Sequence, residues 1–544
     1  DITGTVYGGF TDVPDGKAHK NTVTINKTIT GKVVGGEAEG EATYNTVNIN
    51  QSAGDVIGGK SAGAAASNNI INIKANSGAV TGGKSMGAEA SRNIINIENA
   101  ITGAVTGGDS TKTDSNTVNL TNTTVNGTIT GGTADGGLGN TLTVKGKNTA
   151  QNIKGFQMVE FHADTSDTAT ETPLLTLITG ATTLAGKDVI NVEGSTASGK
   201  ITLLHNANGI NIEGYTGGDP LQSKTTDTTE KNVSVLRNSS GKITDITYEG
   251  YQFSRVESFV EKAVATGKEA YGGISKAGNT TSYNKITVNG NYEAVYGGHT
   301  SGSGSDQIGD LKNHSFRNTV TITGGTIGKV YGGYTESADG TTTFNTVNLG
   351  DGTNALADGT TIAEIHGGNK AATKNTLVVN AKAQVGTISN FDKVTFNYKE
   401  SMGNDPMLTL TQADAKFDLN TIDATFDAKA TPVTLVHNEN GLTLEGYTEG
   451  AVKSTLNADG TQETNIDVRK TGTRNTDVIR YAYTFKGKNT ASSATESGIT
   501  STWGGRSVAG NTTTGNMITV GTGNHTNIYG GWTTGAGSTA AADR

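Results

Sequence analysis

The sequence has no cysteine and hardly any proline. Its 544 residues include 5 prolines and no cysteine, and charged residues make up only 17%. Without cysteine the chain cannot form disulfide scaffolds, thiolate zinc sites or cysteine nucleophiles. The low proline and charge contents exclude a disordered chain of the Pro-rich or charge-rich kind, and the lack of a glycine at every third position excludes collagen.

Long apolar runs and basic clusters are also missing. No stretch reaches the roughly 18 consecutive apolar residues of a membrane-spanning helix, so we expect no such helix. The formal net charge is −9, and no stripe of lysine and arginine is present that would neutralise phosphates. We therefore expect no nucleic-acid partner.

The abundant residues are those of turns and of exposed strand faces. Glycine occurs 77 times, about twice its average share, and Thr, Asn and Ser fill much of the rest. Because Gly, Asn and Thr are poor helix formers, a long coiled coil is excluded. An all-β chain with many tight turns remains.

Two short motifs recur along the first 145 residues with one period. The first, Asn-x-(Val/Ile/Leu)-x-(Ile/Leu/Val), repeats every 23 or 24 residues, and the second, a β-branched residue followed after one position by Gly-Gly, repeats every 23 to 27. The asparagines are Asn21, Asn45, Asn69, Asn93, Asn116 and Asn140, and the first glycines are Gly8, Gly35, Gly58, Gly82, Gly107 and Gly131. A shared period of this length is typical of solenoids, propellers and arrays.

The pattern inside each repeat selects the solenoid. Apolar residues alternate after each asparagine, as at Val23 and Ile25, and the intervening Thr22 and Thr24 should face outward. A propeller blade would need about 40–45 residues, and the leucine-rich repeat motif is absent. We predict an all-β fold, a parallel β-helix (solenoid) with coils of about 24 residues, in which Asn and Thr form hydrogen-bonded ladders outside or at corners.

The chain also repeats itself on a longer scale. ITLLHNANGINIEGYT from Ile201 matches VTLVHNENGLTLEGYT from Val433, and NTLTV from Asn140 matches NTLVV from Asn375, which gives a superrepeat of 232 to 235 residues. Within one continuous solenoid we predict a first regular ladder at 1–145, an irregular segment at 146–270, a second ladder at 271–380, an irregular segment at 381–502, and the start of a third ladder at 503–544. The only helix we predict lies at Val256–Ala270.

These motifs resemble the β-helical passenger domain of bacterial autotransporter (type V secretion) adhesins. The resemblance rests on VYGGFT from Val6, NTVTI from Asn21, VYGGYT from Val330 and the run NTLVV…ISNFDKVTF…PMLTL between Asn375 and Leu410. It implies a right-handed coil, a location at the bacterial cell surface or outside the cell, and tethering to a C-terminal outer-membrane β-barrel. We expect this chain to be the passenger alone, part of a longer protein.

Catalytic and metal-binding patterns are scarce. No P-loop, His-Glu-x-x-His or repeated carboxylate pair occurs, so we assign no catalytic residue, no metal ligand and no cofactor. His205 and His437 occupy matched positions, either as a paired ligand site or as turn residues copied with their coil. The acidic loop Ser303–Asp310 could bind calcium, although its spacing is not that of an EF-hand.

Aromatic residues gather around the later Gly-Gly pairs. By alternation they should point outward, where they could stack on sugar rings or anchor a protein partner, or else stack on one another and stabilise the turns. The candidate column consists of Tyr271, Tyr296, His299, Tyr331, Tyr334, His366, Trp503, Tyr529 and Trp532.

Three functions follow from this reading. The first is a non-enzymatic adhesin that associates with itself or attaches to surface proteins or glycans of other cells, through many weak contacts along an Asn/Thr face. The second is a passive stalk that displays a distal domain. The third is a polysaccharide-degrading enzyme, a class that also uses β-helices.

Overall fold

The computed structural model describes residues 2–135, 137–164, 172–194, 200–217, 220–226, 228–302, 313–370, 374–424, 426, 431–487, 492–496, 499–519 and 527–535. These residues form two compact units, Asp1–Tyr251 and Gln252–Arg544. Each is an all-β solenoid of parallel stacked coils with about 25 residues per turn, as the sequence predicts. Among the described residues, none of the helices has the length and apolarity required to traverse a lipid bilayer.

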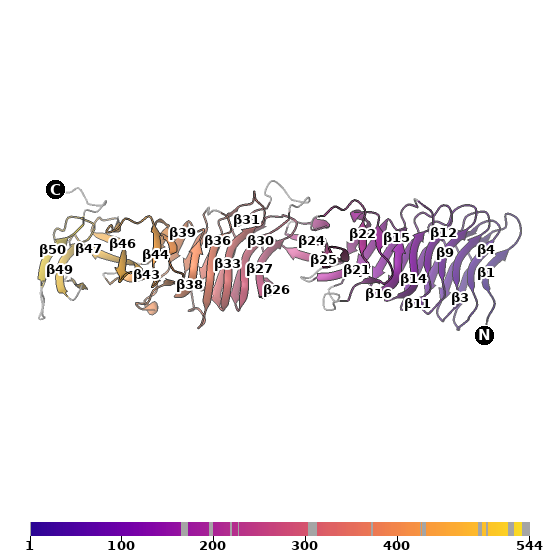
Figure 1. Ribbon diagram of the computed structural model, residues 1–544, viewed down its shortest axis with the longest axis horizontal. Helices are drawn as coiled ribbons and strands as arrows, with labels where there is room; N and C mark the ends of the chain where they lie inside the picture. Colours follow the sequence, from indigo (N-terminus) through magenta and orange to yellow (C-terminus); the bar gives the residue numbers. More distant parts are fainter. Residues whose placement is uncertain are drawn as a thin grey trace. The chain divides into compact units, whose positions relative to one another are not determined.

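Unit 1 consists of two main parallel sheets to which each coil contributes one strand (Figure 1). The larger sheet contains β1 (Val6–Thr11), β4 (Val33–Ala38), β7 (Val56–Ser61), β9 (Val80–Ser85), β12 (Val105–Asp109), β14 (Thr124–Gly132), β16 (Asn148–Lys154), β18 (Leu175–Leu177) and β21 (Lys200–Asn206). The second sheet contains β3 (Thr22–Ile25), β6 (Thr46–Ile49), β8 (Ile70–Ile73), β10 (Ile94–Glu98), β13 (Thr117–Thr121), β15 (Thr141–Lys145), β17 (Met158–His162) and β20 (Ile190–Glu193). Short strands complete the coils: β2 (Ala18–His19) with β5 (Ala42–Thr43), β19 (Thr182–Leu184) with β22 (Ile210–Ile212), and β11 (Ile101–Thr102) beside β14, while η2 (Lys187–Val189) is a single 3₁₀ turn.

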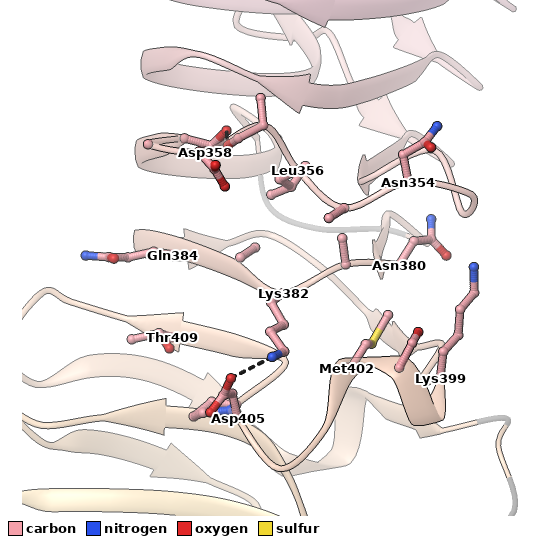
Figure 2. Close-up of a pocket in the computed structure, with 18 of the residues that line it drawn as sticks. Asn354, Leu356, Asp358, Asn380, Lys382, Gln384, Lys399, Met402, Asp405 and Thr409 are labelled. Atoms are coloured by element: carbon pink, nitrogen blue, oxygen red, sulfur yellow. Dashed lines mark hydrogen bonds and ion pairs between the residues drawn. The ribbon is translucent and has the colours of Figure 1, made fainter.

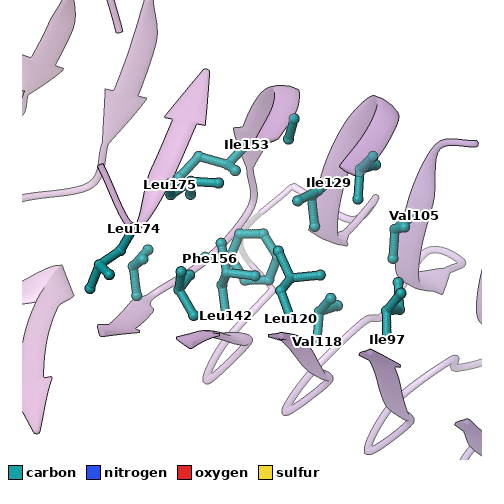
Figure 3. Packing of buried hydrophobic residues seen from close by; sticks show 14 of the residues in the cluster. Ile97, Val105, Val118, Leu120, Ile129, Leu142, Ile153, Phe156, Leu174 and Leu175 are labelled. Carbon is teal, nitrogen blue, oxygen red and sulfur yellow. The ribbon is translucent and has the colours of Figure 1, made fainter. Parts of the chain in front are cut away.

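The core of unit 1 lies between the two sheets. Equivalent residues of successive coils are in register, so that Val23 pairs with Val47 and Val47 with Ile71. The apolar members of both motifs point inward and are buried, and Figure 3 shows Leu120, Ile129 and their neighbours facing one another across the core. Burying one or two aliphatic side chains per strand is sufficient because each coil stacks on the next, which explains the low hydrophobic content.

The two motifs share a period because they contact each other at one corner of the coil. The Asn69 carboxamide is fully buried, and its Oδ1 accepts hydrogen bonds from the backbone N (3.0 Å) and Nδ2 (3.1 Å) of Asn45. Asn69 in turn donates to Asn93, so a ladder of amides runs from coil to coil. A Cβ on Gly58 would lie 2.8 Å from the Cβ of Asn69 and 2.3 Å from the carbonyl oxygen of Gly82, so only glycine fits against the ladder.

Unit 2 repeats this architecture. Its larger sheet contains β26 (Val260–Val264), β27 (Gly267–Ser275), β30 (Tyr292–Thr300), β33 (Thr326–Thr335), β36 (Thr361–Gly368), β38 (Ala383–Ser389), β40 (Leu408–Leu410) and β43 (Val433–Asn438). The second sheet contains β29 (Lys285–Asn289), β32 (Thr319–Gly324), β35 (Thr346–Leu349), β37 (Thr376–Val379), β39 (Lys393–Phe396) and β42 (Ile422–Ala424). Shorter elements are β28 (Thr281–Ser282), β31 (Ser315–Phe316), β34 (Thr342–Thr343), η3 (Glu400–Met402), β41 (Ala415–Asp418), η4 (Leu419–Thr421) and β44 (Leu442–Glu445). A separate sheet contains β48 (Ser492–Glu496), β49 (Ile499–Ser507) and β50 (Asn527–Thr533).

The larger sheet of each unit ends in antiparallel strands. In unit 1 these are β25 (Ile243–Gln252), β24 (Thr229–Arg237) and β23 (Gln222–Thr225), and in unit 2 they are β47 (Asn475–Thr484), β46 (Gln462–Thr471) and β45 (Lys453–Leu456). His205 accordingly contacts Asp245 and His437 contacts Asp477, each with Nδ1 to Oδ1 at 2.7 Å. The two histidines therefore occupy equivalent positions in the two units. This favours the interpretation that they are residues repeated together with their coil, and not a paired ligand site.

The helix predicted at Val256–Ala270 is wrong. The segment forms β26 and the start of β27, which pair as an antiparallel hairpin with Val260 opposite Tyr271. The first parallel strand of a sheet has an unpaired edge, and β26 supplies the missing backbone partners for β27. This gain exceeds the helix propensity of a short segment.

Candidate functional site

The aromatic residues predicted to form a column are brought together in two clusters. Tyr271, Tyr296, Tyr331 and His366 lie on β27, β30, β33 and β36 in register and stack along the solenoid. Their ring centroids are 5.0, 5.5 and 4.7 Å apart, with interplanar angles of 15°, 6° and 15°. The column therefore exists within these four coils.

A second column runs beside the first. The rings of His299 and Tyr334 stack at 4.9 Å and meet the first column edge-on, with Tyr296 to His299 at 4.9 Å and Tyr331 to Tyr334 at 5.0 Å. Burial lowers the pKa of His299 to about 4, helped by the charges of Lys262 and Lys276. At neutral pH the ring is therefore uncharged.

The remaining three residues form a separate cluster on β49 and β50. The ring of Trp532 stacks on Trp503 at 5.4 Å and on Tyr529 at 5.5 Å. The guanidinium of Arg506 lies 4.3 Å from the Trp503 ring and 4.9 Å from the Trp532 ring, in cation–π contact.

The prediction that these aromatics are exposed is wrong for Tyr271 and Trp503, which are 7% and 2% exposed. Val34 and Ile57, which precede Gly-Gly in earlier coils, are buried as well. Strand alternation gives the direction of a side chain but not its exposure. Equivalent side chains on coils about 4.8 Å apart cover one another.

The stacking geometry limits what the first column can bind. A sugar ring needs a free aromatic face, but the faces of Tyr296 and Tyr331 are occupied by their neighbours. At one end Lys262 Nζ lies 5.9 Å from the Tyr271 centroid, and at the other end the ring edge of His366 contacts Ser389, with Nδ1 to Oγ at 2.6 Å. Because both faces of the two central tyrosine rings are occupied, this geometry favours stabilisation of the coils over stacking on sugars.

A different surface of unit 1 offers regularly spaced polar groups. On the outer face of the second sheet, Nδ2 of each asparagine donates to Oδ1 of the one before it: Asn72 to Asn48 at 2.8 Å, Asn96 to Asn72 at 2.7 Å, and Asn119 to Asn96 at 2.7 Å. Each amide keeps a second N–H and a second acceptor position. We call this row the outer amide ladder.

Three asparagines of the outer amide ladder, Asn48, Asn72 and Asn96, line a groove. The groove has a volume of about 360 Å³ and is lined by Thr24, Asn48, Asn50, Asn72, Ile73, Lys74, Asn96 and Glu98. Ile70 and Ile94, next to the ladder on the same strands, are 36% and 37% exposed. The sequence predicts the Asn/Thr face as a whole, but not the groove, which depends on side-chain lengths in neighbouring columns.

One group of side chains in the described part of the chain could hold a divalent metal ion. Glu160, His162 and Glu193 lie on the outer faces of β17 and β20, with ligand atoms within 4.8 Å of one another. His162 Nε2 lies 2.9 Å from Glu160 Oε1, and Asn191 Nδ2 donates to Glu160 Oε2 at 3.1 Å. No metal ligand was predicted here, although a Glu-x-His pair followed by Glu one coil later is visible in the sequence.

Other sequence-based candidates cannot be placed. The loop Ser303–Asp310, considered for calcium, lies outside the described residues.

Comparisons with known protein families, with curated proteins and with solved structures find no match to this chain. Fold and surface chemistry are therefore the basis for any functional conclusion.

Proposed function

We propose that this chain is a non-enzymatic adhesive module, the passenger part of an autotransporter-like surface protein, which associates with further copies of itself through the outer amide ladder of unit 1. The observation that carries the proposal is the hydrogen-bonded row Asn48, Asn72, Asn96 and Asn119, the first three of which line a groove. The resemblance of the repeats to adhesin passengers supports the same function.

A second copy is the partner that fits this row best. A complementary surface must present donors and acceptors at the spacing of the strands, about 4.8 Å. A second amide ladder has this spacing by identity, and each free N–H can face a free amide oxygen. Single contacts of this kind are weak, but several acting together give strength through avidity.

The experiment is a concentration series of the full chain by analytical ultracentrifugation. We expect reversible association, and we expect the double variant Ile70→Lys/Ile94→Lys to weaken it strongly, because like charges would face each other beside the groove. The matched control Met86→Lys/Ile101→Lys adds the same charge at positions 74% and 47% exposed. These positions lie off the strands of the outer amide ladder, whereas Ile70 and Ile94 flank the ladder on β8 and β10, so the control should associate as the wild type does.

Two outcomes would contradict the proposal. A wild-type chain that stays monomeric at all concentrations would leave the passive stalk as the better interpretation. Equal weakening by the double variant and its control would show that net charge, and not the groove, governs association.

A further inference from the structure

Unit 2 contains a pocket that unit 1 is not built to form. Its volume is about 540 Å³, within the range of roughly 300–1,000 Å³ of small-ligand sites. It lies where three successive coils pass from the second sheet to the larger sheet (Figure 2). The middle connection, 380–382, has three residues, while those on either side, 350–360 and 397–407, are much longer. The pocket is the hollow above the short connection.

In the described part of unit 1, the connection that matches 350–360 is much shorter. The segment between β13 and β14, which corresponds to 350–360, consists only of residues 122–123. One wall of the pocket therefore has no counterpart in unit 1, although the two units share their coil architecture. Length added at one coil of a solenoid, without change to the core, is how such proteins acquire a site.

The walls of the pocket are held by hydrogen bonds. Asp351 accepts from the backbone N of Thr353 at 2.7 Å and of Asn354 at 2.8 Å, which lowers the pKa of its carboxyl to about 2. Across the pocket, Lys399 Nζ donates to the carbonyl oxygen of Gly352, and Asn380 Nδ2 donates to that of Gly350 at 3.2 Å. The long loop is thereby fixed to the two following coils.

The two ends of the pocket differ in chemistry. Figure 2 shows Asn354, Asn380 and Lys399 gathered at one end, with Asp358 and Gln384 at the other. Lys382 is neutralised by Asp405, with Nζ to Oδ2 at 2.6 Å. Lys399 donates to a carbonyl, and in the described part of the chain it forms no ion pair with a carboxylate. An ammonium has three N–H donors, so Lys399 can also bind an anion.

Between these ends lies a small apolar floor. Leu356 and Met402 are half-buried against the core of unit 2, and Ala381 and Ala383 are buried. An ordinary aliphatic ligand would leave the many polar groups of the rim unpaired, which is unfavourable. A ring with one apolar face, several hydroxyls and one carboxylate satisfies all three parts of the lining.

We infer that this pocket binds an acidic saccharide unit, a sugar ring that carries a carboxylate. The carboxylate lies against Lys399 and the second amide N–H groups of Asn354 and Asn380, whose other N–H groups donate to Asp351 Oδ2 at 2.9 Å and to the Gly350 carbonyl at 3.2 Å. The C–H face of the ring rests on Leu356 and Met402, and hydroxyls bond to Asp358 and Gln384. This site is distinct from the outer amide ladder and gives the module a second kind of partner, a glycan of another surface.

The experiment is saturation-transfer NMR and calorimetry on the full chain with N-acetylneuraminic acid and glucuronic acid as probes, and glucose and N-acetylglucosamine as neutral controls. We expect the acidic probes to bind in the millimolar range or tighter, and the neutral sugars at least about tenfold more weakly, since a charge-assisted contact is lost. Lys399→Gln should remove this preference. The matched control Lys393→Gln, whose lysine pairs with Asp423 outside the pocket, should not.

A second variant tests the place of binding independently of charge. Ser401→Trp adds bulk at an exposed position of the lining, so it should block all probes without affecting folding. Equal binding of acidic and neutral sugars, unchanged binding in Ser401→Trp, or no binding of any acidic probe would each overturn the inference. Lys399→Gln should still self-associate and Ile70→Lys/Ile94→Lys should still bind the probes, so the two proposals fail separately.

Discussion

At the scale of residues, asparagine has two roles only three positions apart. Asn69 and Asn72 both pass hydrogen bonds between coils through their carboxamides. Asn69 is fully buried at the corner, where no water can replace a lost partner, whereas Asn72 lies on the outer face beside the groove. The same side chain is therefore structural at one position and available for binding at the other.

This difference predicts unequal effects of the same substitution. Asn69→Ala removes the acceptor for the backbone N and Nδ2 of Asn45 and the donor to the carbonyl of Ala42, so we expect a loss of about 2–4 kcal/mol. Asn72→Ala, where water can hydrate the freed groups, should lose about 0.5–1 kcal/mol. Urea unfolding at low protein concentration measures both, and equal losses would contradict the burial argument.

His299 predicts a pH dependence of stability. Burial, with the charges of Lys262 and Lys276, lowers its pKa from 6.5 to about 4, so the unfolded chain binds a proton at this site before the folded one does. Stability from this group is complete above pH 6.5 and is lost as the pH falls toward 4, by up to about 3 kcal/mol.

The variant His299→Phe provides the control for this prediction. It keeps an aromatic ring between Tyr296 and Tyr334 but cannot be protonated, so its unfolding free energy should fall less between pH 6.5 and pH 4 than that of the wild type. If the unfolding free energies of the two proteins fell equally with pH, other groups would control the loss of stability in acid. One such group is Glu336, whose Oε1 lies 3.6 Å from His299 Nε2.

At the scale of elements, the strands were predictable and their connections were not. The alternation of apolar residues such as Val47 and Ile49 predicts a strand with one buried face, and β6 is such a strand. The hairpin at 256–270 was missed because its stability comes from the edge of β27, which does not show in the local sequence. The 350–360 loop gives no periodic signal, so neither the pocket nor its lining could be found.

The stacked column predicts a stability effect at the level of the sheet. Tyr331 lies between Tyr296 and His366, on three adjacent strands, so Tyr331→Ala removes two stacking contacts and opens a gap between coils. We expect a loss of about 1–3 kcal/mol. Phe344→Ala, at a ring 44% exposed in the same unit, should cost clearly less. A stable Tyr331→Ala variant with reduced cell binding would instead restore the column as a binding site.

At the scale of the whole molecule, the superrepeat reappears as repeated architecture. The His–Asp contact at 2.7 Å occurs once in each unit, next to the same antiparallel strands. The pocket occurs where the connection of the second unit, 350–360, is longer than its counterpart in the first, 122–123. Duplication fixed the scaffold, and the loops that differ between copies are where a new site could arise without disturbing the core.

The two units have separate hydrophobic cores, so a destabilising substitution in one unit should not destabilise the other. In a solenoid each coil contacts only its neighbours, so a defect weakens nearby coils most. Asn69→Ala should speed amide hydrogen exchange in unit 1, most strongly in β6, β8 and β10, and leave unit 2 unchanged. Asn345→Ala, which removes the matching buried donation from Asn345 Nδ2 to Asn375 Oδ1, should do the reverse. If either substitution accelerated exchange equally in both units, the chain would unfold as one cooperative body, and the separation of the cores would have no energetic meaning.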